Sequence, residues 1–299
     1  MKVLVTGANG MLGQDLCPML ENEGYSVIRT DVDNMDITKL DDVENVLNKE
    51  NPDIVIHCAA YTNVESAETK EGAELATDIN TKGVFFLSGA CKRVGAVLIH
   101  ISTDYVFNGL KNQPYSSKDE DYLSPLNKYG YTKLTGEYCI KESGCKYLIF
   151  RTSWLYSEFG NNFVKKIYKK IVTNNSCKVV FDQTGSPTYA MDLAKFIYGI
   201  IENNNSENRY LSQTGIYHFA NKGVASWYDM SKEIEHFCKK DESVLVTDCL
   251  SNEFKTMAVR PNYSVLDCSE IKKIFGYDIP YWKDSLMKCI EEIYKMTNK

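Results

Sequence analysis

The sequence predicts an α/β protein built on a doubly wound parallel sheet, followed by a smaller C-terminal α/β lobe. Through the first half of the chain, short apolar runs alternate with longer amphipathic stretches. Strands that are apolar on both faces and separated by helices are typical of a parallel sheet covered on both sides. After about residue 152 the alternation becomes irregular, which indicates a second, smaller lobe over the ends of the strands.

Each expected element follows from its local pattern. Strands rich in β-branched or large apolar residues are expected at Lys2–Thr6, Tyr25–Arg29, Asp53–Cys58, Ala96–Ile101 and Tyr147–Phe150. Helices are expected between them at Leu12–Glu23, Leu40–Asn48, Ala73–Val94 and Pro125–Glu142. Ser124 and Pro125 are interpreted as the N-cap and first position of the last of these helices.

The second half of the chain gives a sparser pattern. Helices are expected at Phe163–Val172, Ala190–Glu202, Trp227–Cys238 and Ser285–Met296, with short strands at Lys178–Phe181 and Tyr217–Ala220. The polar stretch 203–208 is interpreted as a solvated loop.

Composition limits the kinds of partner. The chain has 299 residues, 43% of them hydrophobic and 25% charged, which is typical of a globular protein with a sizeable core. A net charge of −6 gives no reason to expect binding to nucleic acid or an anionic membrane. No apolar run approaches the ~20 residues of a membrane span. The ten cysteines are scattered, without a CxxC pair or a signal peptide, so we expect reduced thiols in a cytoplasmic protein.

A glycine-rich turn follows the first expected strand. Residues 5–13 read VTGANGMLG, so Gly7, Gly10 and Gly13 recur at every third position where the first helix begins. Such a turn lets the backbone approach a pyrophosphate, which then accepts hydrogen bonds from N–H groups at the helix N-terminus. The turn therefore predicts a Rossmann-like dinucleotide site that also includes Asn9, Met11 and Leu12.

Residues after the second and third strands extend this site. Asp31 lies where an acid can bind the adenosine ribose hydroxyls, which favours NADH, whereas the nearby Arg29 could accommodate the 2′-phosphate of NADPH. Either cofactor is therefore expected. Asp36 and Ile37 could flank the adenine, and Ala59 and Ala60 offer small side chains where the cofactor passes; a loop or cap role for Asp36 is equally compatible.

Three further residues predict the chemistry. Thr103 ends the fourth strand, at the edge where such sheets bind ligands. Tyr129 and Lys133 are four residues apart and share a helix face, whereas Tyr131 points elsewhere. A lysine ammonium can stabilise a tyrosine anion, which otherwise has a pKa near 10. Spacing alone is weak, because Tyr228 also has a lysine four residues later; the location beside a nucleotide-binding turn favours Tyr129.

Together these motifs resemble the extended short-chain dehydrogenase/reductases, and within them the dTDP-4-dehydrorhamnose reductases. The similarity spans nearly the whole chain and rests on VTGANGMLG (5–13), AAYTNVESAE (59–68), STDYVFNG (102–109), PLNKYGYTKLTGE (125–137), RTSWLY (151–156), DQTGSPT (182–188), YHFAN (217–221), SWYDMSKEI (226–234) and RPNYSVLD (260–267). The resemblance implies a dinucleotide-binding domain over residues 1–152 and a mainly substrate-binding lobe over residues 153–299, some segments of which return to the large domain.

The resemblance also implies a reaction. A reductase of this kind would reduce the C4 ketone of dTDP-4-dehydro-6-deoxy-L-mannose to give dTDP-L-rhamnose, a precursor of cell-surface polysaccharides. Thr103, Asp104, Tyr105, Tyr129, Trp154 and Arg260 would then contact the nucleotide sugar, and Tyr129 and Lys133 would also contact the cofactor, Lys133 at the nicotinamide ribose. Trp154 could equally close the interface between lobes, and Arg260 could equally form a surface salt bridge.

Three alternatives remain open at this point. The protein could be another nucleotide-sugar 4-ketoreductase, an epimerase, or a non-catalytic regulatory subunit that binds a dinucleotide. Related dehydratases have an aspartate and then a glutamate after the strand-end threonine, as acid and base for water elimination. Here Asp104 is followed by Tyr105, which cannot serve as the carboxylate base, so water elimination is disfavoured. Some relatives hold Mg²⁺ between subunits, and Asp15 is a possible counterpart of one ligand, but the other ligands cannot be assigned and no metal is predicted. A homodimer is possible.

Overall fold

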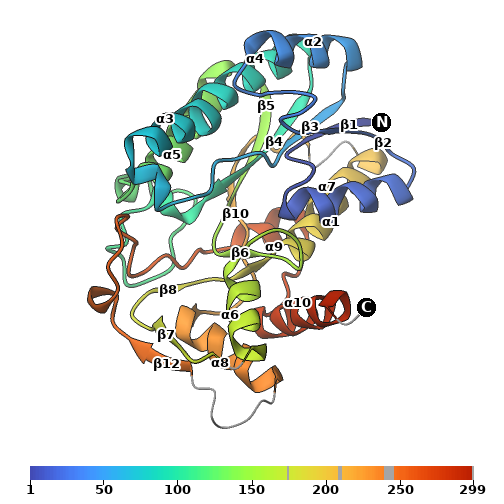
Figure 1. Ribbon diagram of the computed structural model, residues 1–299. Coiled ribbons are helices and arrows are strands. Elements are labelled where there is room, and N and C mark those ends of the chain that lie inside the picture. The colour runs from blue at the N-terminus through green and yellow to red at the C-terminus, as the bar shows by residue number, and fades with distance from the viewer. Residues whose placement is uncertain (174, 208–210, 239–245, 298–299) are drawn as a thin grey trace.

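Six parallel strands form the central sheet, in the order β10-β5-β4-β3-β1-β2 (Figure 1). This computed structural model describes residues 1–173, 175–207, 211–238 and 246–297. The strands are β1 (Lys2–Thr6), β2 (Ser26–Thr30), β3 (Ile54–His57), β4 (Val97–Thr103), β5 (Lys146–Thr152) and β10 (Gly215–His218). The strand order reverses between β1 and β3, and such a reversal leaves a crevice at the carboxyl ends of the strands. The doubly wound fold expected from the sequence is thus confirmed.

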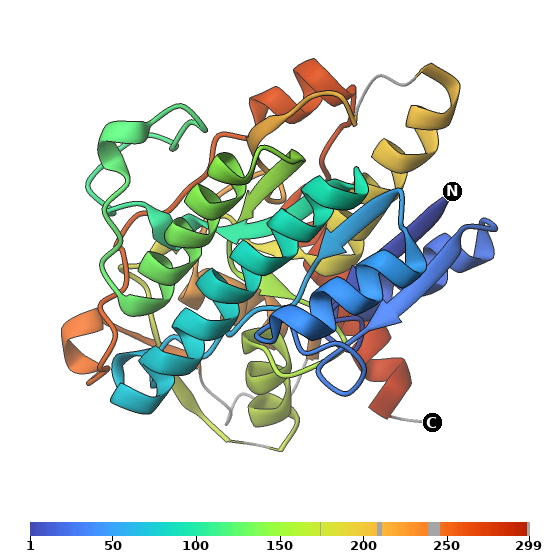
Figure 2. The ribbon, with the colours of Figure 1, turned by 90° about the horizontal axis from the view of Figure 1, so that it is seen from above.

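Helices cover both faces of the sheet (Figures 1 and 2). The helices α1 (Met11–Asn22), α7 (Ala190–Glu207) and α9 (Ser269–Phe275) pack on one face, and α2 (Leu40–Glu50), α4 (Val84–Val94) and α5 (Lys128–Ser143) on the other. The alternation of β1 decides which side chain faces which layer. Val3 and Val5 join the core beneath α1 and α7, whereas Leu4 joins the core beneath α2 and α4, and all three are fully buried.

One expected helix is interrupted. The stretch expected as Ala73–Val94 consists of most of α3 (Lys70–Thr77), the π-helical turn η2 (Asp78–Gly83) and then α4, and a further short helix, η1 (Ser66–Glu68), precedes it. Within η2 the buried Asn80 side chain accepts from the Tyr61 N–H (2.9 Å) and donates to the Tyr61 carbonyl (3.0 Å). These two bonds hold the loop that contains Tyr61 against the turn. Single π-helical turns within helices are frequent at functional sites.

The start of α5 also differs from the expectation. The helix begins at Lys128, and Asn127 rather than Ser124 is its N-cap: the Asn127 side chain accepts from the Gly130 N–H at 2.8 Å. The same side chain donates to the carbonyl of Val259 at 2.9 Å. Pro125 therefore lies ahead of the helix, and the cap that satisfies an end of the helix also holds a segment of the C-terminal lobe.

The smaller lobe has a core of its own, at the bottom of Figure 1. Its elements are β6 (Leu155–Tyr156), α6 (Phe163–Val172), β7 (Cys177–Val180), β8 (Thr184–Gly185), β9 (Thr188–Tyr189), β11 (Ala225–Ser226), α8 (Trp227–Cys238), β12 (Val246–Cys249), η5 (Ser251–Glu253) and α10 (Trp282–Thr297). The strands pair as β11-β8, β12-β7 and β6-β9. Two further short helices, η3 (Asp104–Val106) and η4 (Glu120–Tyr122), follow β4 in the large lobe.

Most expectations for the second half hold within a few residues. The bounds expected for α6 and α8 are confirmed. The loop expected at 203–208 is wrong for residues 203–207, because α7 continues to Glu207, and residue 208 lies outside the described residues. None of the helices described here is both long and apolar enough to cross a membrane.

Two glycines test how closely α5 packs. A Cβ at Gly136 would lie 2.4 Å from the carbonyl oxygen of Asn80, whereas a Cβ at Gly199, within α7, would meet nothing within 4 Å. We expect Gly136→Ala to lower the free energy of unfolding by about 1–3 kcal/mol, because the two helices must move apart. Gly199→Ala should raise the free energy by about 0.5–1 kcal/mol through helix propensity. Urea unfolding of both variants measures this, and effects of equal sign would contradict the packing described.

Candidate active site

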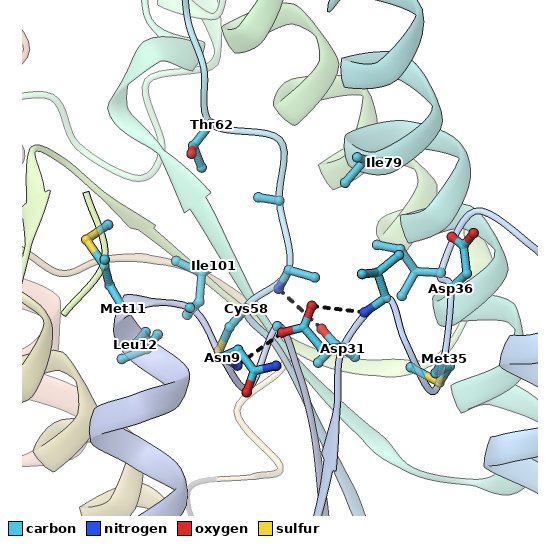
Figure 3. Close-up of a pocket in the computed structure, with 18 of the residues that line it drawn as sticks. Asn9, Met11, Leu12, Asp31, Met35, Asp36, Cys58, Thr62, Ile79 and Ile101 are labelled. Carbon is cyan, nitrogen blue, oxygen red and sulfur yellow. Dashed lines mark hydrogen bonds between the residues drawn. The ribbon is translucent and has the colours of Figure 1, made fainter. Parts of the chain in front are cut away.

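A cavity of about 790 Å³ opens at the carboxyl ends of β1, β2 and β3 (Figure 3). It lies at the strand reversal, where doubly wound sheets bind nucleotides. Ten of the residues expected at a cofactor line it: Gly7, Asn9, Gly10, Met11, Leu12, Asp31, Asp36, Ile37, Ala59 and Ala60.

The glycine-rich turn forms the floor of this cavity. Gly7 has a φ of +63°, and a Cβ there would lie 2.7 Å from the Ala59 nitrogen, so only glycine fits between β1 and β3. Gly13, in contrast, does not line the cavity. A Cβ on Gly13 would lie 2.5 Å from the Gly7 carbonyl oxygen, so this glycine lets α1 approach the turn. The first N–H groups of α1 consequently face the cavity, which fits the pyrophosphate of a dinucleotide.

Asp31 is fixed at the end of β2. Its carboxylate accepts from the Asn9 N–H (3.1 Å) and the Val32 N–H (2.9 Å), and Figure 3 shows it directed to the glycine turn. Two backbone donors orient the carboxylate where ribose hydroxyls of a bound dinucleotide would lie.

The structure resolves the question raised by Arg29. Its guanidinium forms a two-pronged ion pair with Glu21 of α1, at 2.7 and 2.5 Å, and it does not line the cavity. The charged side chains among the described lining residues are Asp31, Asp36 and Asp78, all acidic. Asp36 accepts from both the N–H and the hydroxyl of Thr38, at 3.0 and 2.7 Å, so it terminates a turn as well as lining the cavity.

Other lining residues were not anticipated from the sequence. The apolar side chains among them include Met35, Leu75, Ile79, Ile101 and Leu155, and Gly160 and Asn161 contribute from the segment after β6. Leu75 belongs to α3 and Ile79 to η2, and no short sequence pattern predicts that these two side chains line a cavity. An apolar wall beside a glycine turn fits the adenine or nicotinamide ring of a dinucleotide.

The three expected catalytic residues lie close to the end of β4, next to Ile101 of the cavity lining, but none of the three lines the cavity itself. Thr103 ends β4, and Tyr129 and Lys133 lie one turn apart near the start of α5. A hydrogen bond with Thr103 lowers the pKa of Tyr129, but burial outweighs it and raises that pKa to about 12. The Tyr129 hydroxyl is therefore protonated at neutral pH.

Lys133 takes a direction that spacing did not predict. Its ammonium donates to the carbonyl of Ile101, a cavity-lining residue of β4, at 2.7 Å, and lies 3.5 Å from His100 Nε2. Burial lowers the pKa of Lys133 to about 8, while Glu137 and Cys58 oppose that change. The lysine thus joins α5 to β4 and remains mostly cationic at pH 7.

Asp104 and Tyr105 follow Thr103 in the short helix η3. Asp104 is buried, accepts from the Thr103 hydroxyl at 3.1 Å, and has one oxygen, Oδ2, without a partner. Burial raises the pKa of Asp104 to about 7. The Tyr105 ring meets that of Tyr129 edge-on, with centroids 5.9 Å apart. Tyr105 therefore borders Tyr129, and Asp104 is near enough to raise the pKa of Tyr129 further.

Arg260 reaches this site from the C-terminal lobe. Its guanidinium pairs with Glu65 at 2.5 Å and hydrogen-bonds Tyr105. Glu65 lies in the segment after β3 and also accepts from the Met257 N–H at 2.9 Å. The salt bridge considered from the sequence is present, and it lies beside Tyr105 rather than at a remote surface.

Trp154 packs against the core of the smaller lobe. Its φ is +49°, and its ring stacks on Trp227 with centroids 3.7 Å apart and planes 11° apart. A Cβ on Gly185 would lie 2.6 Å from the indole, so β8 packs against the ring. The ring is half-buried, and the left-handed backbone indicates a conformation held by its surroundings.

Two further candidates can be assigned. Lys232, four residues after Tyr228 in α8, is paired with Glu235, remote from the cavity. Asp15 is buried near Ser157 and Glu158. Across the part of the chain that the structure describes, no group of three or more His, Cys, Asp or Glu side chains is arranged to hold a metal ion.

Comparison with known proteins gives a consistent result. The family model described as RmlD substrate binding domain matches residues 1–295. A dTDP-4-dehydrorhamnose reductase of Aggregatibacter actinomycetemcomitans is 36% identical over 293 residues, covering 95% of this chain and 97% of that protein.

Solved structures agree with this match. A dTDP-4-dehydrorhamnose reductase of Clostridium acetobutylicum is 40% identical, has a TM-score of 0.90, and covers 98% of this chain and 100% of its own. A dTDP-4-dehydrorhamnose reductase of Bacillus anthracis, solved in complex with NADP, is 37% identical with a TM-score of 0.89 and covers 97% and 99% of the two chains. With a match over nearly its whole length, the chain belongs to the RmlD substrate-binding-domain family, alongside these dTDP-4-dehydrorhamnose reductases.

Proposed function

We propose that the protein is an NAD(P)H-dependent oxidoreductase that reduces the C4 ketone of dTDP-4-dehydro-6-deoxy-L-mannose to give dTDP-L-rhamnose. The observation that carries this proposal is the meeting of Thr103 and Tyr129 beside Ile101, where a dinucleotide-sized cavity ends. The names of relatives at 36–40% identity over nearly the whole chain support the substrate.

The chain's own groups are suited to ketone reduction. A bound reduced nicotinamide supplies a hydride to the ketone carbon. The Tyr129 hydroxyl, protonated at neutral pH, gives its proton to the oxygen on which negative charge develops, and Thr103 hydrogen-bonds the same oxygen. Lys133 brings a positive charge to the inner end of the site, which favours the tyrosinate that remains.

The substrate contacts are proposed from the position of four side chains. Asp104, with its unpartnered oxygen, and Tyr105 border Tyr129 and could bind sugar hydroxyls. Arg260 suits a two-pronged contact with a diphosphate. Trp154 is half-buried and stacked on Trp227, and we propose its remaining exposed surface as a contact for the sugar or the base. Tyr105 cannot act as a carboxylate base, so reduction is favoured over water elimination.

The division of labour is also a proposal. Residues 1–152 would bind the dinucleotide, and residues 153–299 would mainly bind the nucleotide sugar, with β10, α7 and α9 completing the large domain. The homodimer and the cytoplasmic location stay predictions.

Turnover tests the function directly. Purified protein given dTDP-4-dehydro-6-deoxy-L-mannose and NADH or NADPH should consume the reduced nicotinamide, followed at its absorbance band, and form dTDP-L-rhamnose. An epimerase would show no net consumption, and a regulatory subunit would show none without a second protein. Either result would overturn the proposal.

Tyr129→Phe removes the proposed proton donor. We expect kcat to fall by about 10²–10⁴-fold, the usual contribution of general acid catalysis. Tyr131→Phe is the matched control, because Tyr131 is 56% exposed and its ring lies under the Lys128 ammonium, 5.2 Å from the centroid. Full activity of Tyr129→Phe in the nicotinamide assay would contradict the mechanism.

Asp31 should set the preference between the two cofactors. With only acidic charged groups on the described lining of the cavity, we expect a higher kcat/KM for NADH than for NADPH. Asp31→Asn should improve NADPH relative to NADH by about 10-fold, because one repulsion of the 2′-phosphate is removed. Asp33→Asn is the control, since Asp33 is exposed nearby but does not line the cavity. An unchanged ratio for Asp31→Asn would refute this role.

A further inference from the structure

A fully buried polar cluster lies beneath the candidate active site, between α5 and the sheet. It consists of Glu137 of α5, Ser102 of β4 and Arg151 of β5, which are 1%, 3% and 2% exposed. None of the three lines the nucleotide cavity. The reaction proposed above gives them no role.

The cluster is well connected. The Glu137 carboxylate accepts from the Ser102 hydroxyl at 2.5 Å and from Arg151 Nε and Nη2 at 2.9 and 2.6 Å. Ser102 and Arg151 are direct neighbours across β4 and β5. One carboxylate on the helix thus binds two adjacent strands near their carboxyl ends.

Stability alone does not explain a buried ion pair. Removing two charges from water offsets much of their attraction, and apolar side chains of similar volume often serve as well. Arg151 Nη1 has no partner, and Glu137 is the carboxylate with which its guanidinium pairs within the described chain. Glu137 also faces Tyr147 of β5, whose pKa it raises in addition to the effect of burial.

Helical spacing connects this cluster to the catalytic residues. Glu137 lies four residues after Lys133 and eight after Tyr129, so all three share one face of α5. The Lys133 ammonium is bound to the carbonyl of Ile101, and the next residue of β4 is Ser102, which is bound to Glu137. Two consecutive residues of β4 therefore hold two consecutive turns of α5.

Glu137 is the charged neighbour of Lys133. The other titratable groups facing that ammonium are His57, His100 and Cys58. Burial lowers the pKa of His57 to about 3 and that of His100 well below its usual value, and burial raises the pKa of the Cys58 thiol. These three groups are neutral at pH 7, which leaves Glu137 as the anion that faces the lysine.

We propose that Glu137 is a positioning residue for the reduction: its carboxylate, held by Ser102 and Arg151, seats the helix that carries Tyr129 and Lys133 and keeps the lysine ammonium charged. This role rests on the proposed function of Tyr129 and Lys133. The guanidinium of Arg151 approaches the carboxylate from β5 and neutralises its charge. Its central carbon lies over the Phe107 ring, 5.1 Å from the centroid.

The test compares Glu137→Gln with the double variant Glu137→Gln/Arg151→Met. The single variant leaves a buried guanidinium without a counter-ion and should lower Tm, whereas the double variant removes that charge and should recover most of the Tm. In both, Lys133 loses its anion and its pKa should fall. The high-pH limb of kcat/KM should therefore move to lower pH by about one unit, with kcat lowered several-fold.

Asp119→Asn provides the control. Asp119 pairs with the largely buried Lys111 and is a partner in none of the bonds of Glu137 described above, so this variant also breaks an ion pair but leaves those bonds in place. It should lower Tm and leave the pH profile unchanged.

The outcomes separate the hypotheses. A double variant that recovers Tm but keeps the displaced limb supports the positioning role. Recovery of both Tm and the wild-type profile overturns it, because Glu137 would then act only in packing, and an unshifted limb in the folded single variant overturns it as well. Wild-type protein without any turnover would instead refute the proposed function.

Discussion

The close seating of α5 on β4 is the constraint on which the rest of the site depends. A Cβ at Gly130 would lie 2.2 Å from the carbonyl oxygen of Tyr105, and one at Gly136 would lie 2.4 Å from that of Asn80. Glycine at both positions lets α5 approach η3, which directly follows β4, and the π-turn η2. This approach is what allows Lys133 to reach a strand carbonyl and Tyr129 to meet Thr103. The relative positions of Thr103, Tyr129 and Lys133 thus depend on these close backbone contacts.

Parallel strands bring the remaining parts to the same edge. Because the strands of the sheet are parallel, the glycine turn after β1 and Thr103 at the end of β4 emerge together although about a hundred residues separate them. The C-terminal lobe is tied to that edge through polar contacts: Asn127, the cap of α5, holds the Val259 carbonyl, and Glu65 holds Arg260. The segment that carries Arg260 is therefore held by the cap of α5 and by the segment after β3.

The sequence predicted what is encoded locally. The periodicity of apolar residues, the spacing of the glycines and the four-residue step from Tyr129 to Lys133 each reflect geometry within a single strand, turn or helix. The strands and most helices accordingly lie within a few residues of their predicted bounds. What it missed depends on distant partners. Arg29 pairs with Glu21 on the neighbouring helix, and Lys133 turns to Ile101 of β4. The turn at Asn80 is also fixed by bonds to a distant loop. No pattern within a short window reports such contacts.

The charge distribution explains how an acidic protein can hold an anionic cofactor. The net charge is −6, and the charged groups on the described lining of the cavity are carboxylates. Attraction for a pyrophosphate must therefore come from the N–H groups and dipole at the start of α1, which act at short range and are oriented by the fold. Two cationic side chains lie near the cavity without lining it. Lys133 is bound to the carbonyl of Ile101, and Arg260 is paired with Glu65. If Asp31 lies at the adenosine ribose as proposed, its repulsion acts most strongly on a 2′-phosphate and less on the pyrophosphate, because Coulomb energy falls with distance from the carboxylate.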